Sequence, residues 1–107
     1  LAERWSVGAV RWANHDRKQQ LNIGTQLIAP VAYAVGIRQL DQDIFERAML
    51  LPELSTLRQE TSMIAAPGTY SAARVLELDE GGRLQRIMIT RLVESTARFE
   101  RFQFARL

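Results

Sequence analysis

The sequence is short of several residue types, and each shortage excludes a class of function. It has 107 residues and no cysteine, which excludes a disulfide framework, a thiolate metal site and a thiol nucleophile. A single histidine is too few for a zinc site, so we expect no metal and no cofactor. No apolar run approaches the roughly 18 residues that a membrane span needs. The lack of cysteine is typical of a reducing compartment, and we expect a cytoplasmic protein.

Catalytic motifs are missing as well. The chain contains no G-x-S-x-G nucleophile elbow, no G-x-x-x-x-G-K-[ST] phosphate loop and no G-x-G-x-x-G fingerprint. His15 and Asp16 are neighbours, but they lie in a polar stretch typical of a solvated loop. Asp79 and Glu80 precede two glycines, and turn chemistry accounts for them. We therefore expect no catalytic residues and no enzyme activity.

The length and composition are those of one folded domain. Apolar residues make up 47% of the chain, charged residues 24%, and the net charge is +2, which is typical of a globular protein. Two independent cores would be hard to build from 107 residues. The chain begins at Leu1 rather than at methionine. We expect residues 1–107 to form a single domain that is a fragment of a longer protein.

A period of two dominates the hydrophobic pattern and predicts strands. Turn signals separate the strands, namely Pro30 after the second strand, 66–69, and the strong hairpin signal 79–82 with its paired glycines. The predicted fold is all-β, a small antiparallel β-barrel of about six or seven strands with at most one short helix. The expected strands are 5–12, 19–28 (half-buried), 31–38, 56–65, 70–78, 83–93 and 98–104.

Residues 41–54 allow two interpretations. Asp41 is a suitable cap for a helix in which Ile44, Phe45 and Ala48 would share one side. Residues 48–51 also suit a short buried strand that ends at Pro52. We favour a short helical or irregular connection.

The basic residues are almost all arginine and cluster towards the two ends of the chain. Thirteen of the 14 are arginine, which suits phosphate binding but also arises in an arginine-biased genome. Residues 1–40 carry a net charge of +3, residues 41–82 of −5 and residues 83–107 of +4. If the two basic ends meet in space, they form a positive face for an anionic partner.

The two tryptophans allow a similar choice. Trp5 and Trp12 are seven residues apart, which on a regular strand predicts opposite faces, with one side chain in the core and the other partly exposed. Arg11 and Trp12 together are typical of a binding surface, because a base stacks on an indole. Alternatively, Trp12 covers the mouth of the barrel, and we favour this second interpretation.

One segment resembles a known family. Gly8-Ala-Val-Arg-Trp12, a polar turn and then Leu21-Asn-Ile-Gly-Thr-Gln-Leu-Ile28 resemble the closing hairpin of PilZ-type domains. The resemblance covers about residues 5–30, and residues 31–107 are expected to form a further β-unit that packs on this hairpin or is swapped with it. It implies a six-stranded antiparallel barrel in a bacterial signalling protein, with cyclic di-GMP as ligand.

The ligand signature of that family is absent from this chain. An R-x-x-x-R arm followed by D/N-x-S-x-x-G does not occur, and the pairs Arg83/Arg86 and Arg98/Arg101 have a different spacing. The signature would then lie upstream of Leu1, or the barrel would have lost the nucleotide.

The predicted function is a non-catalytic regulatory or interaction module that resembles PilZ domains. Its expected partners are other domains of the parent protein, a protein partner or a second copy in a homodimer, and cyclic di-GMP is a candidate ligand. The alternative is a small nucleic-acid-binding barrel of the OB or SH3-like kind. For any phosphate ligand, the candidate binding residues are Arg11, Trp12, Arg17, Arg86 and Arg91.

Overall fold

A computed structural model describes residues 4–107, apart from the side chain of Leu57. Leu1, on which the expectation of a fragment rests, lies outside these residues. The elements are the strands β1 (Arg4–His15), β2 (Leu21–Gln39), β3 (Glu46–Leu51), β4 (Ser62–Ala65), β5 (Val75–Glu80), β6 (Arg83–Ser95) and β7 (Glu100–Arg106), with one 3-10 turn, η1 (Ser55–Leu57), between β3 and β4. The prediction of an all-β antiparallel fold is confirmed. Over residues 4–107, the structure contains no helix that is long and apolar enough to cross a membrane.

Six of the strands close into a barrel. The sheet order is β1-β2-β3-β4-β7-β6-β5, and a further pairing of β2 with β5 joins its ends. The second half of β2 makes this closure, because Tyr33–Ile37 pairs with β3 while Gly36–Gln39 pairs with β5. Residues 33–107 therefore complete the barrel by themselves. The expectation that residues 5–30 supply a closing hairpin is wrong, because β1 pairs with β2 outside the ring.

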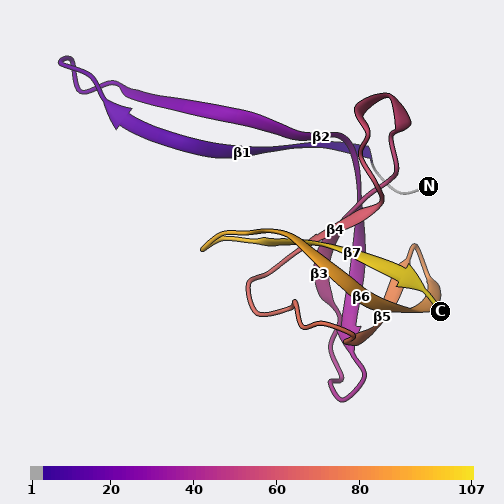
Figure 1. The fold of residues 1–107 in the computed structure, drawn as a ribbon. Coiled ribbons are helices and arrows are strands. Elements are labelled where there is room, and N and C mark those ends of the chain that lie inside the picture. Colours follow the sequence, from indigo (N-terminus) through magenta and orange to yellow (C-terminus); the bar gives the residue numbers. More distant parts are fainter. Residues whose placement is uncertain (1–3) are drawn as a thin grey trace.

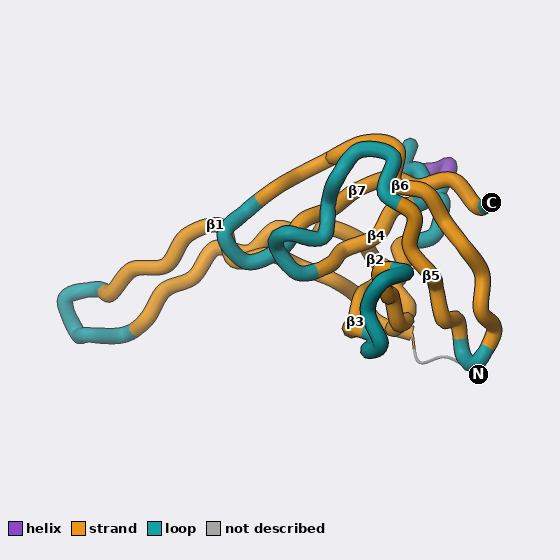
Figure 2. Tube along the Cα trace, turned by 90° about the horizontal axis from the view of Figure 1, so that it is seen from below, coloured by secondary structure: helices purple, strands orange, loops and turns teal. Residues whose placement is uncertain are grey.

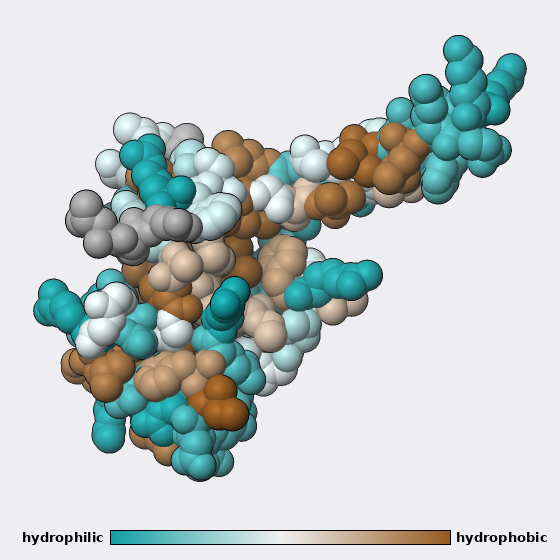
Figure 3. Space-filling model, turned by 180° about the vertical axis from the view of Figure 1, so that it is seen from behind, coloured by the Kyte–Doolittle hydropathy of each residue, from teal (hydrophilic) through white to brown (hydrophobic). Residues whose placement is uncertain are grey.

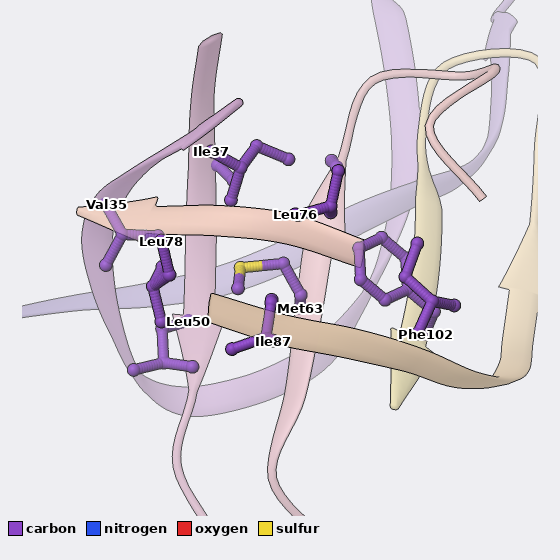
Figure 4. Close-up of a cluster of buried hydrophobic side chains, with 11 residues drawn as sticks. Val35, Ile37, Leu50, Met63, Leu76, Leu78, Ile87 and Phe102 are labelled. Carbon is purple, nitrogen blue, oxygen red and sulfur yellow. The ribbon is translucent and has the colours of Figure 1, made fainter. Parts of the chain in front are cut away.

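The barrel interior is filled by side chains that alternate along its strands. Phe102 of β7, Met63 of β4, Leu78 of β5 and Ile87 of β6 are completely buried, and Val35 reaches them from β2 (Figure 4). Each such side chain stabilises the fold by about 1.5–3 kcal/mol relative to an exposed position.

The first hairpin projects from the barrel as an arm. We define the arm as β1, the turn at residues 16–20 and residues 21–32 of β2; Figure 1 shows it extending away from the other strands. It gives the molecule extents of 53 × 32 × 26 Å and a radius of gyration of 15.6 Å. A compact chain of this length would have a radius near 13 Å. The expectation that residues 19–28 are half-buried is wrong, because β1 is the only described strand that pairs with this part of β2 and most of its side chains are exposed.

Pro30 does not end a strand. β2 is 19 residues long and runs through Pro30 without a break. The predicted break between residues 28 and 31 is therefore wrong. The register moves from Trp5 opposite Ala32 to Val7 opposite Ala29, which leaves Pro30 in a bulge. A bulge tolerates proline because the ladder does not need its missing N–H. The Ser6 hydroxyl donates a hydrogen bond of 2.8 Å to the Pro30 carbonyl and holds the bulge in place.

The base of the arm packs against the outside of the barrel. Ala29 and Ala32 of β2 are fully buried there against Leu51 of β3. Ile28 of β2 and Ile64 of β4 pack at the edge of this second cluster. Apolar residues thus occupy both faces of β3 and β4, and the outer set fixes where the arm leaves the barrel.

Two stretches between strands differ from expectation. Residues 46–51 form β3 rather than a helical or irregular connection, because ladders with β2 and β4 hold both edges and bury Ala48 and Leu50. The alternative of a short strand ending at Pro52 is the one observed. The strand expected over 56–65 is shorter, since η1 precedes it and β4 begins at Ser62.

The hairpin predicted at residues 79–82 is confirmed. Gly81 and Gly82 have φ values of 59° and 94°, and the Gly82 N–H donates to an Asp79 carboxylate oxygen at 2.7 Å. Asp16 has a similar role in the turn of the arm, where one of its carboxylate oxygens accepts hydrogen bonds from the backbone N–H groups of Lys18 and Gln20. Both aspartates thus have structural roles in turns.

Candidate functional site

A hollow lined by arginines opens on the outer face of the barrel beside the base of the arm. Its volume is about 430 Å³. Strands β4, β6 and β7, the end of the arm and the loop after η1 all contribute to it. Figure 2 shows the hairpin of the arm extending to one side of the barrel that contains β4, β6 and β7. We call it the arginine hollow and define it by Ile28, Arg58, Gln59, Glu60, Ser62, Arg91, Val93, Arg101 and Gln103.

A bulge in β6 brings Arg91 into this hollow. Ile89 lies opposite Phe104 of β7, and both side chains belong to the interior of the barrel. The register then shifts, so that Arg91 rather than Thr90 lies opposite Gln103. Because the extra residue changes the alternation, Arg91 shares the outer face with its partner on β7.

Arg101 is the most constrained arginine of the hollow. Its Nε donates a hydrogen bond of 2.9 Å to Oγ of Ser62, which is 1% exposed. Burial lowers the pKa of Arg101, while the nearby Glu94 carboxylate acts in the opposite direction. The guanidinium stays charged, since arginine is protonated at any pH that a protein tolerates. Within the described part of the chain, no carboxylate oxygen lies within 4.0 Å of it.

A chain of hydrogen bonds orients the neighbouring side chains. Nε of Arg91 donates to Oε1 of Gln103 at 3.2 Å, and Nε2 of Gln103 donates to Oε2 of Glu60 at 2.7 Å. Arg58 follows η1 in the left-handed conformation, with φ of 50°, and adds a third guanidinium. Three arginines against Glu60 leave the hollow with a formal charge of +2. Such a cluster is suited to bind an anion with two negative charges.

Arg11 connects the arm to the barrel near this hollow. Its guanidinium lies 2.6 Å from Oε1 of Glu94 on β6, and its Nε donates to Oε1 of Gln26 on the arm at 2.8 Å. The hydrogen bond to Glu94 raises the pKa of Arg11. Arg11 thus reaches from the middle of β1 to the β6–β7 hairpin, and its charge is already paired.

Comparison with known proteins identifies the barrel. Residues 33–107 match the family model of the FimW C-terminal β-barrel domain. The chain belongs to this family. The matched residues coincide with the closed barrel. They lie outside residues 5–30, on which the resemblance in the sequence was based. The prediction of a PilZ-like β-barrel domain is confirmed.

A curated relative points in the same direction. The cyclic-di-GMP receptor FimW of Pseudomonas aeruginosa is 24% identical to this chain over 106 residues, which cover 95% of the chain. The chain spans 18% of the length of that receptor. The match includes the arm as well as the barrel. No solved structure matches the chain.

The predicted binding residues fall in different places. Arg91 lines the arginine hollow, and Arg11 lies beside it through its bond to Glu94. Arg17 lies in the turn at the tip of the arm. Arg86 is in register with Glu77 of β5 and lies five residues before Arg91 on β6, outside the residues that define the hollow. The structure therefore brings two of the four arginines to one region and leaves two apart.

Only part of the prediction for the tryptophans holds. Trp5 and Trp12 are 50% and 53% exposed, so the expectation that one of them is in the core is wrong. Trp12 does not cover the barrel mouth but lies over Gly24 across the arm, where a Cβ would collide with its indole. Three register shifts along the β1–β2 ladder upset the simple alternation from which opposite environments were inferred.

The sequence interpretation missed Arg58, Arg101 and Gln103. Arg101 appeared only in a pair with Arg98 whose spacing failed the family signature, and Arg58 lies in the acidic middle of the chain. Their meeting depends on the β4–β7 and β6–β7 ladders. One signal was available, because Arg101 alternates with Phe102 and so predicts a basic outer face beside an apolar inner one.

Proposed function

We propose that this domain is a non-catalytic regulatory module of cyclic di-GMP signalling and that the arginine hollow binds the nucleotide. The observation that carries the proposal is the partly buried guanidinium of Arg101, which lines the hollow together with Arg91 and has no carboxylate oxygen within 4.0 Å among the described residues. Partial burial of a cation is costly, and a phosphate oxygen at hydrogen-bond distance would offset that cost more fully than Glu94, which lies beyond ion-pair distance. The relationship to a cyclic-di-GMP receptor supports the choice of anion.

The charge and size of the hollow suit this ligand. A cyclic dinucleotide carries two phosphodiesters, each with one negative charge, and the hollow has a formal charge of +2. Guanidinium groups bind phosphate oxygens through two parallel hydrogen bonds. The volume of about 430 Å³ lies within the usual range for small-molecule sites, and the open side leaves room for a base to extend.

The proposed site uses arginines from separate elements instead of one short motif. Arg58 follows η1, Arg91 comes from β6 and Arg101 from β7. Arginines from separate elements would allow a PilZ-like barrel to bind the nucleotide without the R-x-x-x-R motif. The hollow includes Ile28 at the base of the arm, so a bound nucleotide would contact both the barrel and the arm. Regulation would follow from a change in how the arm meets another protein surface.

Calorimetric titration with cyclic di-GMP tests the proposal. We expect Arg91→Gln and Arg101→Gln each to weaken binding by about tenfold or more, because a hydrogen bond to a charged group contributes about 1.5–3 kcal/mol. Arg86→Gln is the matched control, since it removes the same charge from the same strand outside the hollow. It should change the dissociation constant by less than about twofold.

Titration with two further ligands separates this function from its alternative. One is linear pGpG, which has a free terminal phosphate. The other is a single-stranded oligonucleotide, which represents the predicted nucleic-acid-binding function. Tighter binding of the oligonucleotide, with a steep loss on adding salt, would favour the nucleic-acid barrel. No heat with cyclic di-GMP at millimolar concentration, or equal losses in Arg86→Gln and Arg91→Gln, would overturn the proposed site. The nucleotide recovered after incubation should be unchanged.

A further inference from the structure

The arm carries an apolar face that the described residues leave uncovered. The ladder places His15 opposite Leu21, Ala13 opposite Ile23 and Val10 opposite Thr25. Paired residues lie on one side of a ribbon, so these side chains share a face with Leu27. We define the arm face as Val10, Ala13, Leu21, Ile23, Thr25 and Leu27. Its four large apolar side chains are 52–62% exposed.

The opposite side of the arm is the one that approaches the barrel. Trp12 and Gly24 are paired there, and Ala9, opposite Gln26, is buried. Gln26 holds Arg11, which bonds to Glu94 of β6. The arm face therefore points away from the barrel. Figure 3 shows hydrophobic residues along the arm and a hydrophilic group at its tip.

A hairpin of this kind needs a cover. Two paired strands are marginally stable in water, and a third strand or an apolar partner is usually required. Over residues 21–32, the described part of the chain provides β2 with β1 alone as a ladder partner, and the outer edge of β1 is free. Clustered exposed apolar side chains of this extent indicate an interaction site.

We propose that the arm face binds the arm face of a second copy of this chain. From their fractional exposure, the six residues present on the order of 550 Å² in one copy, so two stacked copies would bury at most about 1,100 Å², at the lower end of what a specific interface needs. An apolar face with few charges is complementary to itself, as a two-fold axis requires. The two ribbons would stack as sheets do, about 10 Å apart, with the charged tips in solvent.

Measurement of mass in solution tests this interface. Light scattering after size-exclusion chromatography, from about 1 to 200 µM, should show a monomer that converts to a dimer. Ile23→Asp places a charge in the middle of the arm face and should weaken dimerisation at least tenfold. Asn22→Asp is the control, because it adds the same charge at the next position on the opposite side, where Asn22 is paired with Asn14.

A cross-linking experiment gives a second, independent measurement. The chain has no cysteine, so one introduced thiol is unique. Thr25→Cys should give a covalent dimer with a short bis-maleimide, whereas Asn22→Cys should remain mostly monomeric. A monomer at 200 µM, or equal dimerisation of Ile23→Asp and Asn22→Asp, would overturn the proposal. A monomer would indicate that another protein surface covers the arm. Circular dichroism of each variant checks that the barrel is folded.

Discussion

The strand β2 runs through both the barrel and the arm, and its two halves differ in how far their apolar side chains are buried. In the barrel half, Val35 and Ile37 are buried between strands on both edges of β2. In the arm half, Ile23 and Leu27 alternate in the same way but lie mostly in solvent. The same local pattern therefore gives a core in one half and an open surface in the other.

The difference lies in what each half is paired with. Alternation makes a segment suitable for a strand with one apolar face, but it does not supply the surface that covers this face. β5 lies on the edge of β2 from Gly36 onward and closes the ring, whereas β1 takes that edge earlier and leads away. The barrel is thus a complete hydrophobic unit, and the arm is an incomplete one.

The largest expected effect comes from truncating one side chain in the barrel core and one in the arm. Phe102→Ala should lower the free energy of unfolding by about 3–5 kcal/mol, because it leaves a cavity in the barrel core. Leu27→Ala, at low protein concentration, should lower it by less than about 0.5 kcal/mol, because that side chain is already in water. Urea denaturation followed by circular dichroism measures both. Similar losses in the two variants would show that the arm is covered within the monomer.

A smaller effect is expected from crowding the arm. Gly24→Ala should displace the Trp12 indole, which occupies the space of a Cβ at this position. We expect a local loss of about 1 kcal/mol, seen as faster amide exchange in the arm. Trp12 fluorescence in a Trp5→Phe background should shift to the red. Gly8→Ala is the control, since its Cβ would meet the Gln26 carbonyl at an ordinary 3.4 Å; an equal shift there would refute the stacked geometry.

The smallest effect is expected from releasing the arm from β6. Glu94→Gln removes the charge that pairs with Arg11 and raises its pKa. Global stability should hardly change, because an exposed ion pair contributes little. Faster backbone motion across residues 9–13 should appear in NMR relaxation. Glu80→Gln breaks a comparable exposed pair with Arg106, between strands β5 and β7 of the barrel, and should leave the arm unaffected; identical arm dynamics in both variants would exclude a tether at Arg11.

The sequence predicted the strands well where turn chemistry and alternation agreed. Gly81 and Gly82 require positive φ values, and the hairpin formed there as expected. The sequence prediction failed at Pro30, where a bulge accommodates the proline within the strand. It also failed at β3, where ladders with two strands override the helix signal at Asp41. Both failures are tertiary, because each depends on pairing with another strand rather than on the residues of the segment itself.

The candidate site was predicted only in part for the same reason. Arg91 was named from the basic segment 83–107, but its place in the hollow depends on the bulge before it. Arg101 and Ser62 are 39 residues apart, and only the β4–β7 pairing makes one the hydrogen-bond partner of the other. A motif search compares neighbours in sequence and does not see such contacts.

The sequence by itself determined the all-β character of this protein, its sharp turns and its supply of arginines, because strand period, positive φ and charge are properties of short segments. Tertiary structure alone decided which strands closed the barrel, that the first hairpin became an arm, and which arginines met beside it. These outcomes depend on contacts between distant segments, and the burial of apolar surface by those contacts selects among arrangements that the local pattern leaves equally open.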